Sequence, residues 1–177
     1  HISINLDYTD ILNPQIKKDL VSKIKSNNIG EYLTLEILES EKVSSFDTVN
    51  EFINDVKQFG VKIAIDDFGT GFSNYENILN LNIDYIKIDG SLIRKINEDI
   101  YLNLIKSIVL FSKQQNIKVV AEFVSDLKIL RYVKNIEIDY SQGYYIGKPT
   151  HIQELFGEED ETTTKKDNWF NNKWYFK

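Results

Sequence analysis

The chain has 177 residues, 42% of them hydrophobic, which suits one domain with a substantial core. It contains no cysteine, which excludes disulfides, thiolate metal sites and cysteine nucleophiles, and its net charge of -6 argues against a broad basic surface for duplex nucleic acid. Because no signal peptide and no run of about 18 apolar residues occur, we expect a cytoplasmic domain; because the chain starts at His1 without Met, we expect a fragment.

Strand and helix signals alternate from the first residues onward. Asn13-Pro14 is typical of a helix start, and Gly30 and Gly60 are typical of segments that end a helix. The predicted strands are 2–6, 33–38, 62–66, 85–89, 118–122 and 140–144. A long helix with Ile100, Leu104, Ile108 and Phe111 is predicted before the fifth strand. Six strands separated by helices predict a parallel sheet with right-handed crossovers.

Each of the first five predicted strands alternates apolar and polar residues. In the third strand, for example, Ile63 and Ile65 alternate with Lys62, Ala64 and Asp66. Parallel strands covered by helices on both faces should be apolar on both, so the pattern favours a closed barrel with its polar face inward. The inward polar residues at or near the C-terminal strand ends are Asn5, Glu36, Asp66, Lys87, Glu122 and Gln142. That end is where (β/α)8 barrels place their chemistry.

Residues 63–73 join a β-branched run to two adjacent carboxylates, Asp66 and Asp67, and then to Gly69 and Gly71. In a regular strand the two carboxylates point to opposite faces, so they share a cation only where the pleat breaks. We expect Gly69 and Gly71 to supply that break. A solvated turn built from Asp and Gly is the alternative for these residues taken alone.

Any metal must rest mainly on oxygen ligands, because only His1 and His151 offer imidazole and both lie near the ends. Carboxylate and amide oxygens are the ligands of hard cations such as magnesium and manganese. The residues placed to surround two such cations are Asn5, Glu36, Asp66, Asp67 and Glu122. Glu122 is either a ligand or a further acid at the rim.

Hydrolysis of a phosphodiester suits this set of side chains. Two hard cations about 4 Å apart, bridged by a carboxylate, activate a water and stabilise the attacking and leaving oxygens. Asp66 is the natural bridge, while Lys87, helped by Gln142, is placed either to orient the water or only to balance charge. No Ser-His-Asp arrangement or glycine-rich phosphate loop is available, and Asp67-Phe68-Gly69 matches a protein-kinase tripeptide without its companion loops.

The chain resembles EAL-domain cyclic di-GMP phosphodiesterases over about residues 1–156. The segments that carry the resemblance are Ile4-Asn5-Leu6, Glu36-Ile37-Leu38-Glu39, Asp66-Asp67-Phe68-Gly69-Thr70-Gly71-Phe72-Ser73, Asp84-Tyr85-Ile86-Lys87-Ile88-Asp89-Gly90-Ser91, Val119-Val120-Ala121-Glu122 and Gln142-Gly143-Tyr144-Tyr145-Ile146-Gly147-Lys148-Pro149. They occur in the family's order and spacing. The remaining residues, 157–177, are predicted to form a loosely ordered or disordered tail.

The resemblance implies a TIM-type (β/α)8 barrel, here missing its first strand and helix, that linearises cyclic di-GMP to pGpG with two magnesium or manganese ions. The implied metal ligands are Asn5, Glu36, Asp66, Asp67 and Glu122. The implied catalytic residues are Lys87, Glu122, Gln142 and Asp67, with Lys87 and Gln142 at the nucleophilic water. The residues implied at the nucleotide pocket are Asp89, Tyr144, Gly147 and Pro149. The residues implied to steady the loop at 68–73, which links the metal site to a dimer interface, are Glu39, Thr70 and Gly71.

Two features depart from the family pattern. The Glu-Ala-Leu signature is absent with the first strand and helix, so we expect the chain alone to be inactive or nearly so. The family's Ala-Glu-Gly-Val-Glu reads Ala-Glu-Phe-Val-Ser here, with Phe123 and Ser125 replacing a glycine and an acid. These two residues motivate a second hypothesis, a degenerate domain that binds cyclic di-GMP or only dimerises. Another magnesium-dependent barrel enzyme is the third. We expect a homodimer with a sensory or cyclase domain fused in the parent protein.

Overall fold

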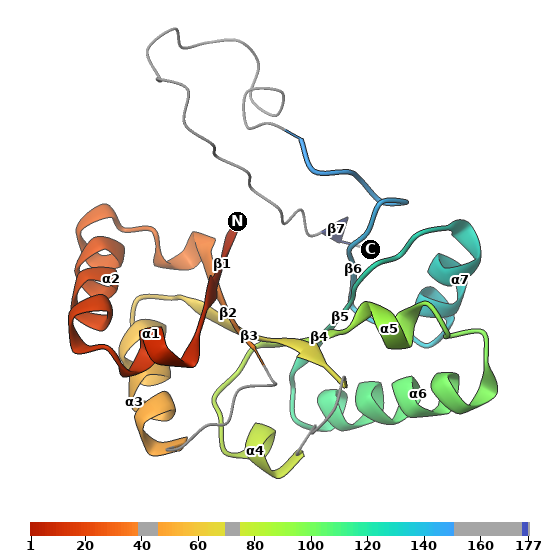
Figure 1. Cartoon of the computed structure of the whole chain (residues 1–177), viewed down its shortest axis with the longest axis horizontal. Coiled ribbons are helices and arrows are strands. Elements are labelled where there is room, and N and C mark those ends of the chain that lie inside the picture. Colours follow the sequence, from red (N-terminus) through yellow and green to blue (C-terminus); the bar gives the residue numbers. More distant parts are fainter. Residues whose placement is uncertain (39–45, 70–74, 151–174, 177) are drawn as a thin grey trace, which may run out of the picture.

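The computed structural model describes residues 1–38, 46–69, 75–150 and 175–176. They form one sheet whose strands follow one another in chain order, and β1 to β6 are all parallel (Figure 1). The strands are β1 Ile2–Leu6, β2 Leu33–Leu38, β3 Lys62–Phe68, β4 Tyr85–Ile88, β5 Lys118–Ala121, β6 Tyr140–Ser141 and β7 Tyr175–Phe176. The prediction of six parallel strands separated by helices is therefore confirmed.

Helices lie in an arc around the convex side of the curved sheet (Figure 1). They are α1 Tyr8–Leu12, α2 Pro14–Asn27, α3 Phe46–Lys57, α4 Tyr75–Leu79, α5 Gly90–Ile93, α6 Asp99–Gln114 and α7 Leu127–Asn135, with a short 3-10 helix at Gly30–Tyr32. The predicted start of α2 is confirmed, because the Asn13 side chain accepts hydrogen bonds from the backbone N–H groups of Gln15 and Ile16. Asp126 starts α7 in the same way by accepting from the N–H of Ile129.

The two faces of the sheet differ as the alternation predicts. The side chains buried in the hydrophobic core include Leu35, Ile63, Ile65, Ile86, Ile88 and Val119. Residues of the other parity lie in register across the strands, with Asn5 beside Glu36 in β1 and β2 and Lys87 beside Val120 in β4 and β5. The polar parity thus lies on the face opposite to the helices.

The described sheet is an open arc whose edges are β1 and β7. The alternation of the strands predicts closure, whereas the described residues form an incomplete barrel, as the resemblance implies. Ile2 and Ile4 on β1 remain 45% and 41% exposed. Strand β7 lies within the predicted tail, and no sequence pattern indicated it; it pairs antiparallel with β6.

Two local features differ from the sequence pattern. The predicted long helix is α6, and its buried face carries Ile108 together with Ile105 and Val109, whereas Ile100 and Leu104 are 75% and 42% exposed. The sixth strand ends at Ser141 and not at 144, because the chain turns at once: the N–H groups of residues 146 and 147 both donate to the carbonyl of residue 143.

Candidate active site

The C-terminal ends of five strands bring the predicted polar residues to one edge of the sheet. In register, Asn5 lies beside Glu36, and Asp66 lies beside Leu38 at the end of β2. Backbone hydrogen bonds continue the alignment beyond the strands, with the N–H of Glu122 donating to the carbonyl of Ile88 at 3.2 Å. The same edge therefore carries side chains from distant parts of the sequence.

Lys87 lies at the centre of this edge. Its Nζ is 2.7 Å from Glu36 Oε2, 2.7 Å from Asp66 Oδ1 and 2.9 Å from Glu122 Oε1. The side chains of Lys87 and Glu36 are only 2% and 1% exposed. Burial by itself would lower the pKa of Lys87, but Glu122, Glu36 and Asp66 outweigh it and raise that pKa. Lys87 is therefore an ammonium shared by three carboxylates, two from β2 and β3 and one from Glu122 directly after β5.

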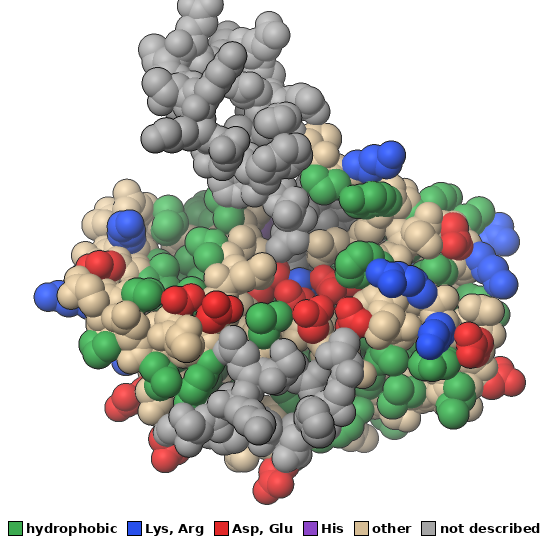
Figure 2. Space-filling view, viewed as in Figure 1, with side chains coloured by type: hydrophobic (Ala, Val, Ile, Leu, Met, Phe, Trp, Pro, Cys, Tyr) green, Lys and Arg blue, Asp and Glu red, His purple; other side chains and the backbone are tan. Residues whose placement is uncertain are grey.

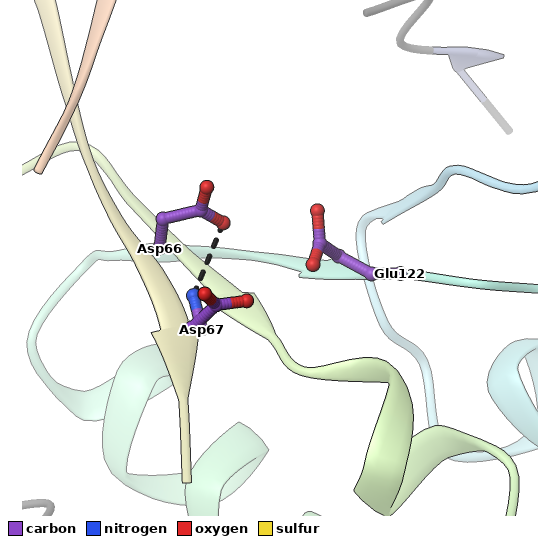
Figure 3. A group of neighbouring side chains, drawn as sticks. All are labelled: Asp66, Asp67 and Glu122. Atoms are coloured by element: carbon purple, nitrogen blue, oxygen red, sulfur yellow. Dashed lines mark hydrogen bonds between the residues drawn. The ribbon is translucent and has the colours of Figure 1, made fainter. Parts of the chain in front are cut away.

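Asp66, Asp67 and Glu122 form a second grouping beside Lys87 (Figure 3). Each offers a carboxylate oxygen, and these oxygens all lie within 4.8 Å of one another. The parallel register of β3 with β4 shifts between Ile65 and Phe68, and Asp67 has a φ of 55°. This break turns two successive side chains toward one place, and the N–H of Asp67 donates to Asp66 Oδ1 at 3.1 Å. The predicted break thus occurs at Asp67 itself, before Gly69.

Negative charge is in surplus in this grouping. Burial and the neighbouring carboxylates together raise the pKa values of Glu122 and Asp67. Burial raises the pKa of Glu122 to about 7, opposed by Lys87 and assisted by Asp66 and Asp67. Burial also raises the pKa of Asp67, and Asp66 and Asp89 raise it further. A further cation at this place would relieve the repulsion that one ammonium leaves unbalanced.

The donor set fits a hard divalent cation. Carboxylate oxygens from Asp66, Asp67 and Glu122 converge, and the Lys87 ammonium already shows that cationic charge is stabilised beside them. Glu36 is fully buried and bound to Lys87, and it lies outside the grouping of three. Asn5 is exposed and reaches the site only through its register with Glu36.

Two other predicted site residues, Gln142 and Asp89, lie in segments next to this cluster. Gln142 is half-buried. Its backbone carbonyl accepts a hydrogen bond from the N–H of Val124 at 2.9 Å, which joins Gln142 to the segment after Glu122. Asp89 starts α5 by accepting from the N–H of Ser91 and contributes to the raised pKa of Asp67.

Apart from Asp89, the predicted nucleotide-pocket residues follow Gln142 in a tight turn. Tyr144 is 70% exposed, Pro149 is exposed and Gly147 is half-buried. Gly143 makes the turn possible, since a Cβ there would lie 2.3 Å from the backbone N and O of Val124. Glu39, Thr70 and Gly71, which were predicted to steady the neighbouring loop, lie outside the described residues.

One contact near the cluster was missed by the sequence analysis. The Arg94 guanidinium carbon lies 4.6 Å from the centroid of the Phe123 ring. The sequence marks Phe123 only as a replacement for glycine, and no pattern singles out Arg94. Gly90 and Arg94 lie four residues apart in the turn that follows β4, and this spacing is the signal that places Arg94 near the site.

Comparison with known proteins identifies the family. The family model described as EAL domain matches residues 1–149. The chain belongs to the EAL domain family. A cyclic di-GMP phosphodiesterase, PdeA, of Borreliella burgdorferi is 42% identical over 130 residues, which are 73% of this chain and 19% of that protein.

Solved EAL structures share the fold. The EAL domain of Mycobacterium smegmatis DcpA has a TM-score of 0.81 at 24% identity, covering 86% of this chain and 70% of that one. The PaMucR phosphodiesterase in complex with c-di-GMP has a TM-score of 0.80 at 25% identity, covering 88% of this chain and 64% of that one. This EAL chain spans about a fifth of the length of the curated relatives it matches. Among the described residues, no helix combines the length and apolarity that a membrane crossing requires.

Proposed function

We propose that the protein containing this EAL chain hydrolyses cyclic di-GMP to linear pGpG with divalent metal ions. The observation that carries the proposal is the convergence of Asp66, Asp67 and Glu122 within 4.8 Å beside the buried ammonium of Lys87. The Borreliella burgdorferi relative is named a cyclic di-GMP phosphodiesterase, and the PaMucR structure holds c-di-GMP, which supports the choice of substrate.

The acids are the part of the chain that would hold metal. Asp66 would bridge two ions, Asp67 and Glu122 would complete the oxygen ligands, and Glu36 with Asn5 would reach one ion from β2 and β1. Magnesium or manganese bound there would supply Lewis-acid stabilisation of the phosphodiester oxygens and a water of lowered pKa. The oxygen-only donor set suits these ions.

The remaining side chains would position the reactants. Lys87 holds three carboxylates in one geometry and places a fixed positive charge beside the phosphodiester, where charge develops on its oxygens. Glu122, whose pKa is about 7 in the metal-free site, can hold a proton there near neutral pH and would release it when a cation binds. Gln142 would orient the attacking water, and the turn from Tyr144 to Pro149 would border the nucleotide.

The test is turnover by the protein encoded by the complete gene, with this chain alone in parallel. The complete protein should convert cyclic di-GMP to pGpG in magnesium or manganese and stop when EDTA is added. The chain alone should be inactive or nearly so, because its sheet has open edges. No pGpG from the complete protein would overturn the proposal, and binding without turnover would identify a receptor or scaffold.

The proposal extends to assembly and location. A homodimer, a fused sensory or cyclase domain and a cytoplasmic location are the arrangement that the family resemblance implies. Sedimentation of the complete protein with and without cyclic di-GMP tests the dimer, and cell fractionation tests the location.

A further inference from the structure

Phe123 occupies an unusual place beside the acids. It follows Glu122 directly, has a φ of 52° and leaves 52% of its side chain exposed. A bulky residue in the left-handed region is uncommon, and such a conformation persists only where the surroundings hold it. A half-exposed ring gains little from burial, so burial alone does not explain why an aromatic residue lies here.

Helix α5 holds the ring from one side. A Cβ built on Gly90 would lie 2.3 Å from Phe123 Cδ2 and 2.6 Å from Cγ, so the ring packs directly on the bare backbone of that glycine. The Arg94 guanidinium carbon lies 4.6 Å from the ring centroid. Arg94 directly follows α5, and its N–H donates to the carbonyl of Gly90 at 3.0 Å, so both contacts come from the same helical turn. The ring is fixed in place while half of it faces solvent.

The surroundings of the exposed ring fit a nucleotide. Figure 2 shows acidic side chains gathered at the middle of this face, with apolar and basic side chains beside them. On the other side, the carbonyl and N–H of Val124 bond to Tyr145 and Gln142, which places the exposed Tyr144 turn next to the Phe123 segment. A planar group with an anionic phosphodiester attached would meet metal-binding acids at one end and the half-exposed ring of Phe123 at the other.

We propose that Phe123, held by Gly90 and Arg94, is a stacking platform for one purine base of the cyclic dinucleotide and so determines substrate affinity. The inference rests on the proposed function for the identity of the substrate. A base stacks on an aromatic side chain through its π face, and the attraction grows when a guanidinium lies over the same ring system. Phe123 then contributes to binding, and the acids carry the chemistry.

The deciding measurement is binding of a hydrolysis-resistant phosphonate analogue of cyclic di-GMP to the complete protein by calorimetry. Phe123→Ala should weaken binding about 5- to 150-fold, the range that loss of one base stack gives. Phe123→Trp should bind within about threefold of the natural protein, because the π face is kept. Tyr32→Ala, which removes another exposed aromatic side chain, is the matched control and should bind unchanged.

A second substrate separates stacking from chemistry. Phe123→Ala should change the hydrolysis of methyl p-nitrophenyl phosphate, a phosphodiester without a base, far less than it raises the KM for cyclic di-GMP, whose kcat should stay nearly constant. Equal or tighter binding of the analogue by Phe123→Ala would overturn the platform. It would show that the ring either makes no contribution to binding or hinders it. Binding that depends on Phe123 without turnover would overturn the proposed function and leave the platform standing.

Gly90→Ala disturbs the Phe123 ring from α5, the helix that it packs against. The added Cβ must displace the ring, so this variant should weaken binding of the analogue by itself and add nothing in the Phe123→Ala background. Additive losses would show that Gly90 acts elsewhere and would count against the platform.

Discussion

Acids at the N-terminal ends of the strands each have their own cations, whereas acids at the C-terminal ends share one. Asp84, before β4, accepts from Lys57, Lys62 and the N–H of Ile63. Asp139, before β6, repeats the arrangement with the next pair of strands by accepting from a lysine and a buried backbone N–H. Both acids satisfy a backbone donor and a lysine at once, so this end of the sheet balances its charges.

The opposite end leaves charge unbalanced. The acids there are Glu36, Asp66, Asp67, Asp89 and Glu122, gathered around the ammonium of Lys87. The raised pKa values of Asp67 and Glu122 show that the fold disfavours the charged forms of these two acids. The N-terminal end of the sheet therefore stabilises the fold, while the C-terminal end gives up stability for a place where cations and a phosphodiester can bind. Substitutions at either end test this difference.

The largest expected effect follows Lys87→Met. The change leaves Glu36, Asp66 and Glu122 buried without their cation, and breaking a buried ion pair in this way costs about 3–5 kcal/mol. Cyclic di-GMP hydrolysis by the complete protein should fall at least about 100-fold. Denaturant unfolding of the chain in EDTA measures the first effect. An unfolding midpoint equal to that of the natural chain would show that the ammonium does not hold this cluster together.

Asp67→Asn should separate stability from function. Asparagine accepts the left-handed φ of 55° as readily as aspartate, so the backbone is kept. A raised carboxyl pKa costs stability above the ordinary value of 3.8, so the variant should unfold at a higher temperature at pH 7 and lose this advantage below about pH 3.

The same variant should bind manganese at least about tenfold more weakly, because one ligand oxygen is lost. Calorimetric titration with the metal alone provides the measurement. Asp10→Asn, at a half-buried acid on α1 outside the proposed metal site, is the control and should leave metal affinity unchanged. Unchanged manganese affinity in Asp67→Asn would remove this residue from the proposed metal site.

Asp84→Asn tests the balanced end. The variant loses two lysine partners, and hydrogen bonds to charged groups are worth about 1.5–3 kcal/mol, so the free energy of unfolding should fall by that order. Burial would raise the pKa of Asp84, but Lys57, the N–H of Ile63 and Lys62 outweigh it and lower that pKa. The stability difference should therefore be full at pH 7 and vanish as the pH falls through the lowered pKa. Hydrolysis of cyclic di-GMP should change less than twofold, and a larger loss would contradict the separation of the two ends.

The site's convergence was predictable because the strand period of two is strict. Once the strands were located, parity alone put Glu36, Asp66, Lys87 and Glu122 on one face and at one end. The left-handed turn at Asp67 was not predictable in the same way, because the sequence offered two glycines as better candidates for the break.

Other features depend on packing that no single segment encodes. Both sides of α6 carry apolar residues, so its periodicity could not decide whether the face with Leu104 or the face with Ile105 is buried. Strand β7 has two residues, too few for any pattern to indicate. Whether Lys87 orients a water or only balances charge also stayed open, since its distances to three carboxylates depend on the register of β2, β3 and β4.

The smallest expected effect is that of Lys118→Met. Lys118 is 57% exposed, and exposed ion pairs contribute about 0–1 kcal/mol, so its loss should lower the unfolding free energy by less than about 0.5 kcal/mol. Asp139→Ala is the informative partner, because it also removes the acceptor of the buried Val119 N–H at 3.0 Å, and an unsatisfied buried donor costs about 1–3 kcal/mol. Denaturant unfolding of both variants measures the two losses of unfolding free energy. Equal losses would assign the stabilisation to the ion pair, whereas the larger loss in Asp139→Ala assigns it to the backbone hydrogen bond that links β5 to the start of β6.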